Sequence, residues 1–145
     1  MTTSIVQRSI LRLLDANANR SLEGVRVCEE IIRFHWNHPA LFRRLRDLRH
    51  DIAQAIQQLP VTPVDLVQAR AVQGDVGRQA PSTSVASLER LLVINLQRGK
   101  ESLRMLEECT RVIAPRHAAP FQRLRFRLYA LERTILLRLA AVRHP

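Results

Sequence analysis

The stretch DANANRSLEGVRVCEE, from Asp15 to Glu30, is the segment around which the rest of this chain can be interpreted. As a helix extended at both ends, it carries apolar residues spaced by three, four or seven positions: Leu11, Leu14, Ala18, Val25, Cys28 and Ile32. A second apolar strip lies on another side and contains Leu13, Val27, Ile31 and Phe34. The pattern predicts a long helix that makes apolar contacts on two sides.

Three polar residues fall among these apolar strips: Asn17, Arg20 and Glu29. The other polar residues share one solvated band, which comprises Arg8, Arg12, Asp15, Asn19, Glu23, Arg26, Glu30 and Arg33. An unpaired polar or charged group on an apolar face costs several kcal/mol. We therefore expect the three misplaced residues to have partners or to bind a ligand.

The same pattern occurs a second time in the chain. NLQRGKESLRMLEE, from Asn95 to Glu108, repeats NANRSLEGVRVCEE at a constant offset of 78 positions, as between Arg20 and Arg98. Further on, LRDLRHDIAQ from Leu45 resembles FQRLRFRLYA from Phe121, which aligns Arg49 with Arg125 at an offset of 76. These matches indicate an internal duplication of a helical hairpin.

The predicted fold is all-α: a four-helix bundle made of two duplicated helical hairpins joined by a long crossover loop. The chain has 145 residues, which is the usual size of a single domain, so we expect one domain over 1–145. Hairpin 1 is expected at about 4–59, the crossover loop at 60–83 and hairpin 2 at about 84–142. Proline-containing turns separate the two helices of each hairpin. A short helical turn is expected over Val64–Ala71, within a connection long enough to be functional or disordered.

The composition bounds the function. The net charge is +10, and every one of the 23 basic residues except Lys100 is arginine. Two explanations of the arginine excess stay open. One is GC-rich coding, which favours arginine codons; the other is anion binding, since a guanidinium can bind phosphate through two parallel hydrogen bonds. No apolar run approaches the roughly 20 residues of a membrane span, and no signal-peptide core is apparent, so we expect a cytoplasmic protein. Cys28 and Cys109 lie on apolar strips and are expected to be buried thiols rather than disulfide or metal ligands.

Five segments stand in an order that resembles a known family: LLDANANRSLEGVRVCEE, LRHDI, ARAVQGDVGR, NLQRGKESLRMLEE and LRFRLYALE. The resemblance spans about Ile10 to Leu137 and is to a small bacterial family of hydroxymethylpyrimidine-phosphate kinases, which occur alone or fused in front of thiamin phosphate synthase. It implies ATP-dependent phosphorylation of hydroxymethylpyrimidine phosphate to the pyrophosphate in thiamin biosynthesis. The composition and the periodicity do not themselves indicate that reaction.

The repeated polar residues are the candidate substrate site. Phosphate would satisfy the arginine donors, and asparagine amides offer the donor–acceptor pair that a pyrimidine edge requires. The predicted substrate- and phosphate-binding residues are Asn17, Arg20, Arg49, Asn95, Arg98 and Arg125. We expect Arg20 and Arg98 to share one pocket, and the two repeats to bind different halves of the reacting pair. The alternative is a buried polar network in which Arg20 pairs with a glutamate and fixes the helix register.

The crossover loop is the candidate reaction centre. Phosphoryl transfer needs a metal or basic groups to neutralise charge. Asp75, next to Gly74 and near Gly77, is expected to bind Mg²⁺, while Arg70 and Arg78 hold phosphate oxygens. Glu29 or Glu107 is expected to supply a second carboxylate to the metal. The alternative is an ordinary Asp-Gly type turn with arginines in solvent. Neither a Walker A motif nor G-x-G-x-x-G is present, so no motif locates the ATP site.

Several sequence features have interpretations other than a kinase. Glu23 with Arg26 and Glu101 with Arg104 are expected to be surface pairs, and His50 a structural histidine. A nucleic-acid-binding module is disfavoured because acidic residues interleave with the arginines and aromatics are only 4%. A non-catalytic domain associated with thiamin phosphate synthase stays open. Apolar residues on two sides of the long helices favour a homodimer.

Overall fold

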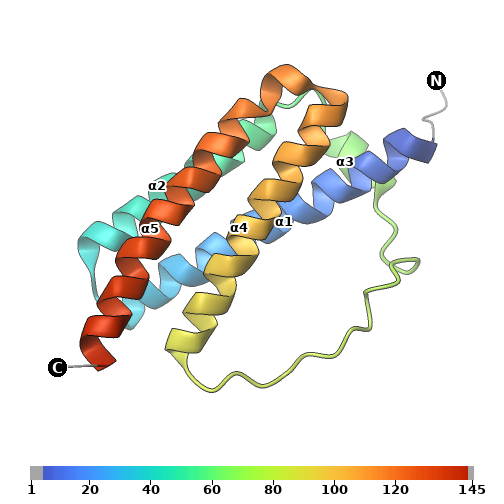
Figure 1. The fold of residues 1–145 in the computed structure, drawn as a ribbon. Helices are drawn as coiled ribbons and strands as arrows, with labels where there is room; N and C mark the ends of the chain where they lie inside the picture. Colours follow the sequence, from blue (N-terminus) through green and yellow to red (C-terminus); the bar gives the residue numbers. More distant parts are fainter. Residues whose placement is uncertain (1–4, 144–145) are drawn as a thin grey trace.

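The computed structural model describes residues 5–143 and contains five α-helices and one 3-10 helix, η1 (Figure 1). Their bounds are α1 Ile5–Phe34, α2 Pro39–Gln57, α3 Pro63–Ala69, α4 Leu88–Ile113, η1 Pro115–His117 and α5 Ala119–Arg143. No strand occurs among these residues, which confirms the all-α prediction. The predicted start of the first helix at Ser4 lies outside the described residues.

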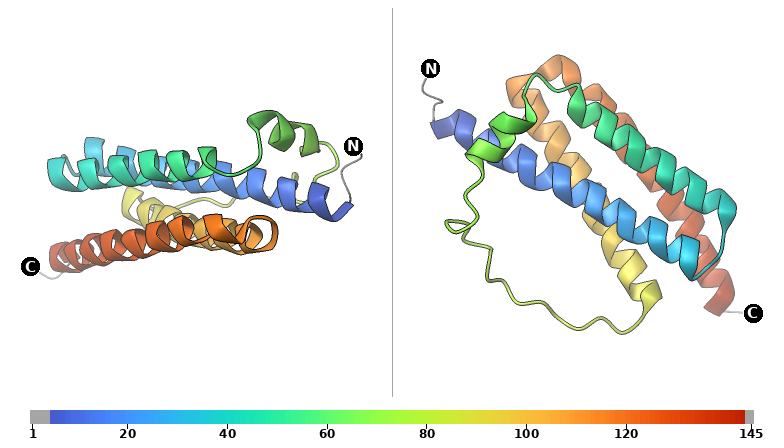
Figure 2. Two further views of the ribbon diagram at one scale, coloured as in Figure 1. Left: turned by 90° about the horizontal axis from the view of Figure 1, so that it is seen from above. Right: turned by 180° about the vertical axis from the view of Figure 1, so that it is seen from behind.

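The two hairpins pack as two layers (Figure 2). α1 and α2 form one layer, and α4 and α5, with η1 at their turn, form the other. α1 packs mainly on α4 and on α2, while α2 packs on α5. The helices meet through large aliphatic side chains that are fully buried, such as Leu45, Leu48, Leu103, Leu106 and Leu128. Each such side chain contributes about 1.5–3 kcal/mol through removal of its apolar surface from water.

Small residues allow α1 and α4 to approach closely where they cross. The duplication aligns Ser21 with Gly99 and Gly24 with Ser102, and all four residues are buried. A Cβ added to Gly24 would lie 3.2 Å from the backbone oxygen of Asn95 on α4, and one added to Gly99 would lie 3.6 Å from Val25 Cγ2 on α1 and 3.0 Å from Leu128 Cδ2 on α5. The crossing therefore requires small side chains, and it brings the asparagine and arginine of each repeat to a common centre.

Side-chain caps define the helix ends more sharply than the hydrophobic pattern does. Ser87 caps α4 by accepting a hydrogen bond of 3.0 Å from the backbone N–H of Arg90. The predicted start of this helix near Ser84 is therefore wrong by about one turn. His38 caps α2 through Nδ1, which accepts a hydrogen bond from the Leu41 N–H, and Pro39 takes the first helical position.

The crossover loop departs from its predicted bounds of 60–83. It contains α3, Pro63–Ala69, at the place of the short helical turn expected over Val64–Ala71, and Thr62 and Asp65 form a reciprocal capping box at its start. α3 packs on α1, and residues 70–87 then follow a path outside the bundle to the start of α4 (Figures 1 and 2). Every residue of 70–87 is exposed. Within residues 5–143, none of the helices combines the length and apolarity that a membrane span requires.

Both cysteines are free and buried, as predicted. The Cys28 thiol donates a weak hydrogen bond to the Leu92 backbone oxygen at 3.7 Å, and burial raises its pKa to about 12. Burial also raises the pKa of Cys109. Because the thiolate is the reactive form, the folded protein should hold almost none of it at pH 8.

We expect neither cysteine to react with 5,5′-dithiobis(2-nitrobenzoic acid) at pH 8 until the protein is unfolded. Absorbance at 412 nm measured with and without guanidinium chloride checks this, and the denatured protein, in which both thiols are released, serves as the control. Rapid release of one equivalent of thionitrobenzoate from the native protein would show that a thiol is accessible.

Candidate functional site

A cavity of about 610 Å³ lies where α1 and α4 cross, and we call it the crossing cavity. Its lining consists of residues from one repeat and their counterparts 78 positions later: Asn17, Arg20, Glu23, Gly24 and Val27 from α1, with Asn95, Arg98, Glu101, Ser102 and Met105 from α4. The duplication therefore builds one pseudo-symmetric cavity rather than two separate sites.

The two asparagines of the crossing cavity adopt the same arrangement. Asn17 Nδ2 donates to the backbone oxygen of Leu13 at 2.9 Å, and Asn95 Nδ2 donates to that of Leu91 at 2.9 Å. Each residue is only 5% exposed. A primary amide has a second N–H and a carbonyl oxygen besides this donor. These remaining groups give each asparagine the donor–acceptor pair that could hold the edge of a planar heterocycle.

Arg20 and Arg98 both line the crossing cavity, although 78 positions separate them. Both residues are more exposed than the asparagines beside them. Among residues 5–143, neither guanidinium forms an ion pair with a carboxylate. The alternative in which Arg20 pairs with a glutamate to fix the helix register is therefore not observed.

A second cavity, of about 560 Å³, lies between the first half of α1 and the crossover loop, and we call it the loop cavity. Its charged lining consists of four arginines and two aspartates: Arg12, Arg20, Arg70, Arg78, Asp15 and Asp75. Asn17 and Arg20 line both cavities, so the two spaces adjoin at these residues. The loop residues Arg70, Asp75 and Arg78, predicted to act together, thus lie around one cavity that opens onto the repeated motif.

An ion pair fixes the start of the loop on α1. Arg70 Nε and Nη2 donate to the two carboxylate oxygens of Asp15, each at 2.7 Å. This hydrogen bonding, with the charge of Asp15, raises the pKa of Arg70. Asp15 is 8% exposed, whereas its place in the helical pattern put it on the solvated band. The duplication could have indicated that Asp15 is buried, because the equivalent position in the second repeat is the apolar residue Val93.

Asp75 forms a turn and also lines the loop cavity. Its Oδ1 accepts a hydrogen bond of 2.8 Å from the Gly77 N–H, and its backbone oxygen accepts one of 3.2 Å from the Arg78 N–H. The turn that the sequence left open as an alternative is therefore present. Its presence does not remove Asp75 from the cavity, where the carboxylate lies among arginines.

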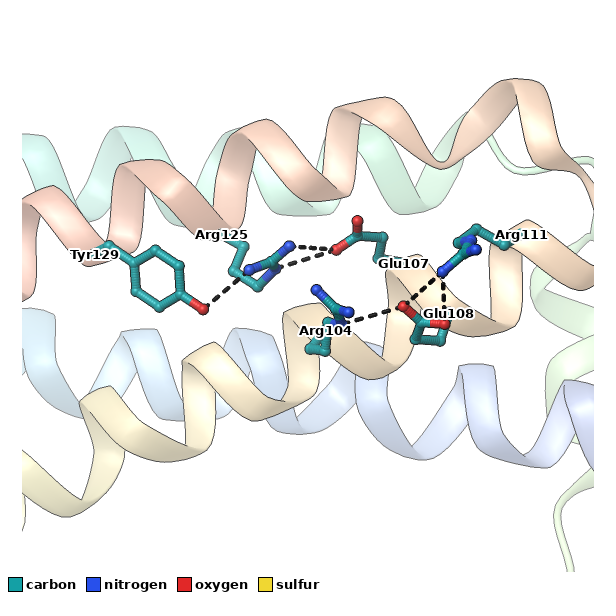
Figure 3. Close-up of polar contacts among 6 residues, drawn as sticks. All are labelled: Arg104, Glu107, Glu108, Arg111, Arg125 and Tyr129. Carbon is teal, nitrogen blue, oxygen red and sulfur yellow. Dashed lines mark hydrogen bonds and ion pairs between the residues drawn. The ribbon is translucent and has the colours of Figure 1, made fainter.

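Two ion pairs, each with a buried glutamate, account for four of the predicted site residues. Glu29 accepts hydrogen bonds from Arg49 Nε at 2.6 Å and Nη2 at 3.2 Å. Glu107 Oε2 accepts hydrogen bonds from Arg125 Nε at 3.1 Å and Nη2 at 2.9 Å (Figure 3). Hydrogen bonding to Glu29 raises the pKa of Arg49. These pairs are equivalent in the two repeats and tie the helices of each hairpin together.

The pairs leave two predictions without support. None of these four residues lines the crossing cavity or the loop cavity. The phosphate-binding role predicted for Arg49 and Arg125 gains no support, because both residues lie outside the two cavities and are paired with carboxylates. The metal-binding role predicted for Glu29 and Glu107 likewise gains no support, since these carboxylates accept the hydrogen bonds of the two arginines. In the described part of the chain, no group of three or more His, Cys, Asp and Glu side chains could hold a metal ion.

The surface pairing predicted along α1 and α4 is observed in part. The pairs of Arg26 with Glu30 at 3.0 Å and of Arg104 with Glu108 at 3.1 Å form as expected at i, i+4 spacing, whereas the i, i+3 pairs with Glu23 and Glu101 are not among the ion pairs of the described residues. Glu23 and Glu101 line the crossing cavity instead. They add acceptors to a cavity whose donors are arginines and asparagines.

Together, the fold and the cavities define an all-α domain built from two repeats around a central polar cavity. Residues 12–134 match the family model described as the ThiD2 family, and the chain belongs to that family. No solved structure matches it.

The chain is similar to several curated proteins named thiamine-phosphate synthase. It is 36% identical to the protein from Rhodopirellula baltica, over 97% of this chain and 38% of the relative. It is 38% identical to the protein from Synechocystis, over 88% of this chain and 36% of the relative. For Gloeobacter violaceus the identity is 33%, over 96% of this chain and 41% of the relative. The chain thus spans well under half the length of these relatives.

Proposed function

We propose that this chain phosphorylates hydroxymethylpyrimidine phosphate to the pyrophosphate with ATP, as a step of thiamin biosynthesis. Membership of the ThiD2 family and similarity to thiamine-phosphate synthases support the pathway. The resemblance of the five sequence segments to hydroxymethylpyrimidine-phosphate kinases supports the reaction. The structural observation that carries the proposal is the junction of two arginine-lined cavities at Asn17 and Arg20.

Two adjoining cavities suit a transfer between two phosphorylated reactants. Enzymatic phosphoryl transfer relies on positioning the reactants and on stabilising the charge that spreads over the transferred group. In the proposed arrangement, the phosphorylated pyrimidine occupies the loop cavity, where Arg12 and Arg78 have no carboxylate partner within residues 5–143 and Arg70 is oriented by its pair with Asp15. The ATP phosphates occupy the crossing cavity at Arg98. Arg20 lines both cavities, and in this proposal it contacts the phosphoryl group as it is transferred from ATP to the pyrimidine phosphate.

The buried amide of Asn17 is the recognition element for the pyrimidine in this proposal. It sits at the junction, and its hydrogen bond to the Leu13 backbone oxygen fixes its orientation. A fixed amide distinguishes a ring nitrogen beside an amino group from an apolar ring edge. Asn95 occupies the equivalent position on the ATP side, so the repeats serve different reactants.

Asp75 is the residue that would hold Mg²⁺. It lines the loop cavity beside Arg78, and Asp15, the other carboxylate there, is paired with Arg70. One carboxylate suits Mg²⁺, which is commonly held by one or two carboxylates together with substrate phosphates and water. When bound, the ion would neutralise charge on the phosphate oxygens.

The direct test incubates the purified chain with hydroxymethylpyrimidine phosphate, ATP and Mg²⁺ and follows pyrophosphorylated product by ³¹P NMR. We expect product formation that depends on both substrates, with unphosphorylated hydroxymethylpyrimidine as the specificity control. Absence of turnover by folded protein at millimolar substrates would overturn the kinase assignment.

Replacing Asp75 by asparagine should lower turnover by about 100-fold while leaving the melting temperature nearly unchanged, because an exposed loop carboxylate contributes little packing. Rates and melting temperatures are measured across Mg²⁺ concentrations. The matched control is Asp65→Asn, which removes the other carboxylate of the crossover segment and should leave the rate unaltered. If Asp75→Asn keeps activity within a few-fold at every Mg²⁺ concentration, Asp75 is a turn residue only.

A second candidate function is a non-catalytic domain that accompanies thiamine-phosphate synthase. The names of the relatives favour it, since they state a synthase activity and no kinase activity, and the matched region makes up 38% of the Rhodopirellula baltica protein. Analytical ultracentrifugation of the chain mixed with a purified thiamine-phosphate synthase tests this association. A stable complex without any phosphoryl transfer would establish the second candidate over the first.

A further inference from the structure

A third cavity, the α4–α5 groove, has a volume of about 410 Å³ and lies on the outer side of the second hairpin. It is lined by Gln97, Lys100, Glu101, Arg104, Met105 and Tyr129. Glu101 and Met105 also line the crossing cavity, so the groove continues from it. Ligand sites commonly have volumes of about 300–1,000 Å³, and the groove falls in this range.

The duplication provides an internal comparison for this groove. Positions that serve the fold alone should match between the repeats, as Glu29–Arg49 and Glu107–Arg125 do. At three positions the second hairpin instead has polar or aromatic residues where the first has apolar ones: Lys100 for Leu22, Tyr129 for Ala53 and Glu132 for Ile56. The first hairpin packs without such a cluster, so the basic fold does not require it.

Lys100 lies between the other two residues, paired with Glu132 and positioned over the Tyr129 ring. Lys100 Nζ lies 2.9 Å from Glu132 Oε1 and 2.8 Å from Oε2, and 5.8 Å from the centre of the Tyr129 ring. Both partners of the ion pair have side chains only 18% exposed. The chain's single lysine is therefore enclosed, and its charge is balanced by Glu132.

The Tyr129 ring is held in a fixed position. Its hydroxyl accepts a hydrogen bond of 3.0 Å from Arg125 Nη1, and Phe126 packs edge-on against the ring at 5.4 Å between centroids. Figure 3 shows Tyr129 beside Arg125 on α5, facing α4, from which Arg104 extends toward them. The fixed ring and the flexible side chain of Met105 give the groove an aromatic wall and an adaptable apolar wall.

The charges of the groove favour an uncharged ligand group. Lys100 is paired with Glu132, and Arg104 with Glu108 at 3.1 Å, while Glu101 adds a negative charge. The cations of the groove are therefore already paired and are not available to a phosphate. The adjoining crossing cavity, in contrast, is lined by Arg20 and Arg98, which have no carboxylate partner within residues 5–143. A flat heterocycle that stacks on an aromatic ring suits the groove, and an attached phosphate chain suits the neighbouring cavity.

We propose that the α4–α5 groove binds the purine base of ATP. The base stacks on Tyr129, the ribose lies at Glu101 between the two spaces, and the phosphate chain enters the crossing cavity at Arg98. Gln97 donates through Nε2 to Glu101 Oε1 at 2.9 Å, and its amide oxygen and second N–H are the groups proposed to meet the base edge. This inference rests on the proposed function, and it provides a nucleotide site in a chain that lacks the usual nucleotide motifs.

The test compares ATP with inorganic tripolyphosphate, which has the phosphate chain but no base. Binding to wild-type protein, Tyr129→Leu and Tyr129→Phe is measured by isothermal titration calorimetry. We expect Tyr129→Leu to weaken ATP binding about tenfold or more, because stacking is lost, and to leave tripolyphosphate binding unchanged. Tyr129→Phe keeps the ring and should retain most of the affinity for ATP. Leu137→Ala, an exposed apolar residue elsewhere on α5, is the control that should bind both ligands like wild type.

The outcomes separate this inference from the proposed function. Equal weakening of ATP and tripolyphosphate by Tyr129→Leu, or no weakening of either, would overturn the groove as the base site. If wild-type protein binds ATP in the expected Tyr129-dependent manner but shows no turnover, the base site stands and the kinase assignment falls. Failure of wild-type protein to bind ATP would overturn both.

Discussion

Replacing Arg20 by lysine is expected to reduce kcat/KM for phosphoryl transfer by about 100-fold, because Arg20 lines both cavities and, in the proposed arrangement, contacts the phosphoryl group as it is transferred. Lysine keeps the positive charge but loses the planar fork that holds two phosphate oxygens at once. Loss of a donor that acts mainly in the transition state should appear in kcat rather than in KM alone.

Steady-state kinetics with each substrate varied in turn distinguishes Arg20 from its repeat counterpart. Arg98 lines only the crossing cavity, so Arg98→Lys should raise KM for ATP and leave KM for the pyrimidine phosphate nearly unchanged. Arg26→Lys is the control, since Arg26 pairs with Glu30 and lines neither cavity. Activity of Arg20→Lys within threefold of wild type would contradict a shared role at the junction.

Replacing Arg125 by methionine is expected to destabilise the protein by about 3–5 kcal/mol. The substitution leaves the Glu107 carboxylate, which is 8% exposed, without its partner in an apolar setting. For a chain of this size, the melting temperature should fall by about 10 °C, measured by calorimetry or circular dichroism.

Two further variants show whether the unpaired carboxylate is the cause. The double variant Glu107→Leu/Arg125→Met removes both charges and should recover most of the lost stability. Arg127→Met breaks an exposed pair with Asp51 and should cost at most about 1 kcal/mol. Equal destabilisation by Arg125→Met and Arg127→Met would show that burial of the pair is not decisive.

Because Arg125 also donates to the Tyr129 hydroxyl, Arg125→Met should weaken ATP binding in addition.

Much of the fold could be predicted because helix periodicity and the duplication are properties of the chain itself. The repeat located the two long helices and aligned the residues that form the crossing cavity, including Arg20 and Arg98. The predicted helix ends were less accurate than the predicted helices, since the start of α4 depends on the Ser87 cap rather than on the hydrophobic pattern.

The candidate site was predicted in part. Asp75, Arg70 and Arg78 could be grouped because they are close in sequence, and the structure places them around one cavity. Asp15 was missed because an acidic residue on a solvated helical band has no local sign of burial. The groove at Tyr129 was missed because its residues come from two helices, and only the divergence between repeats points to it.

The all-α class, the two hairpins and the polar residues that interrupt their apolar faces follow from local residue patterns, because helix periodicity depends on residues a few positions apart. The pairing of charges depends on how the helices pack. Arg49 pairs with Glu29 across 20 positions, and Arg70 with Asp15 across 55. The energy of an ion pair depends on the distance between the charges and on their burial, and packing sets both of these. The same packing left Arg20 and Arg98 without carboxylate partners within the described chain and placed them at the cavity where the helices cross.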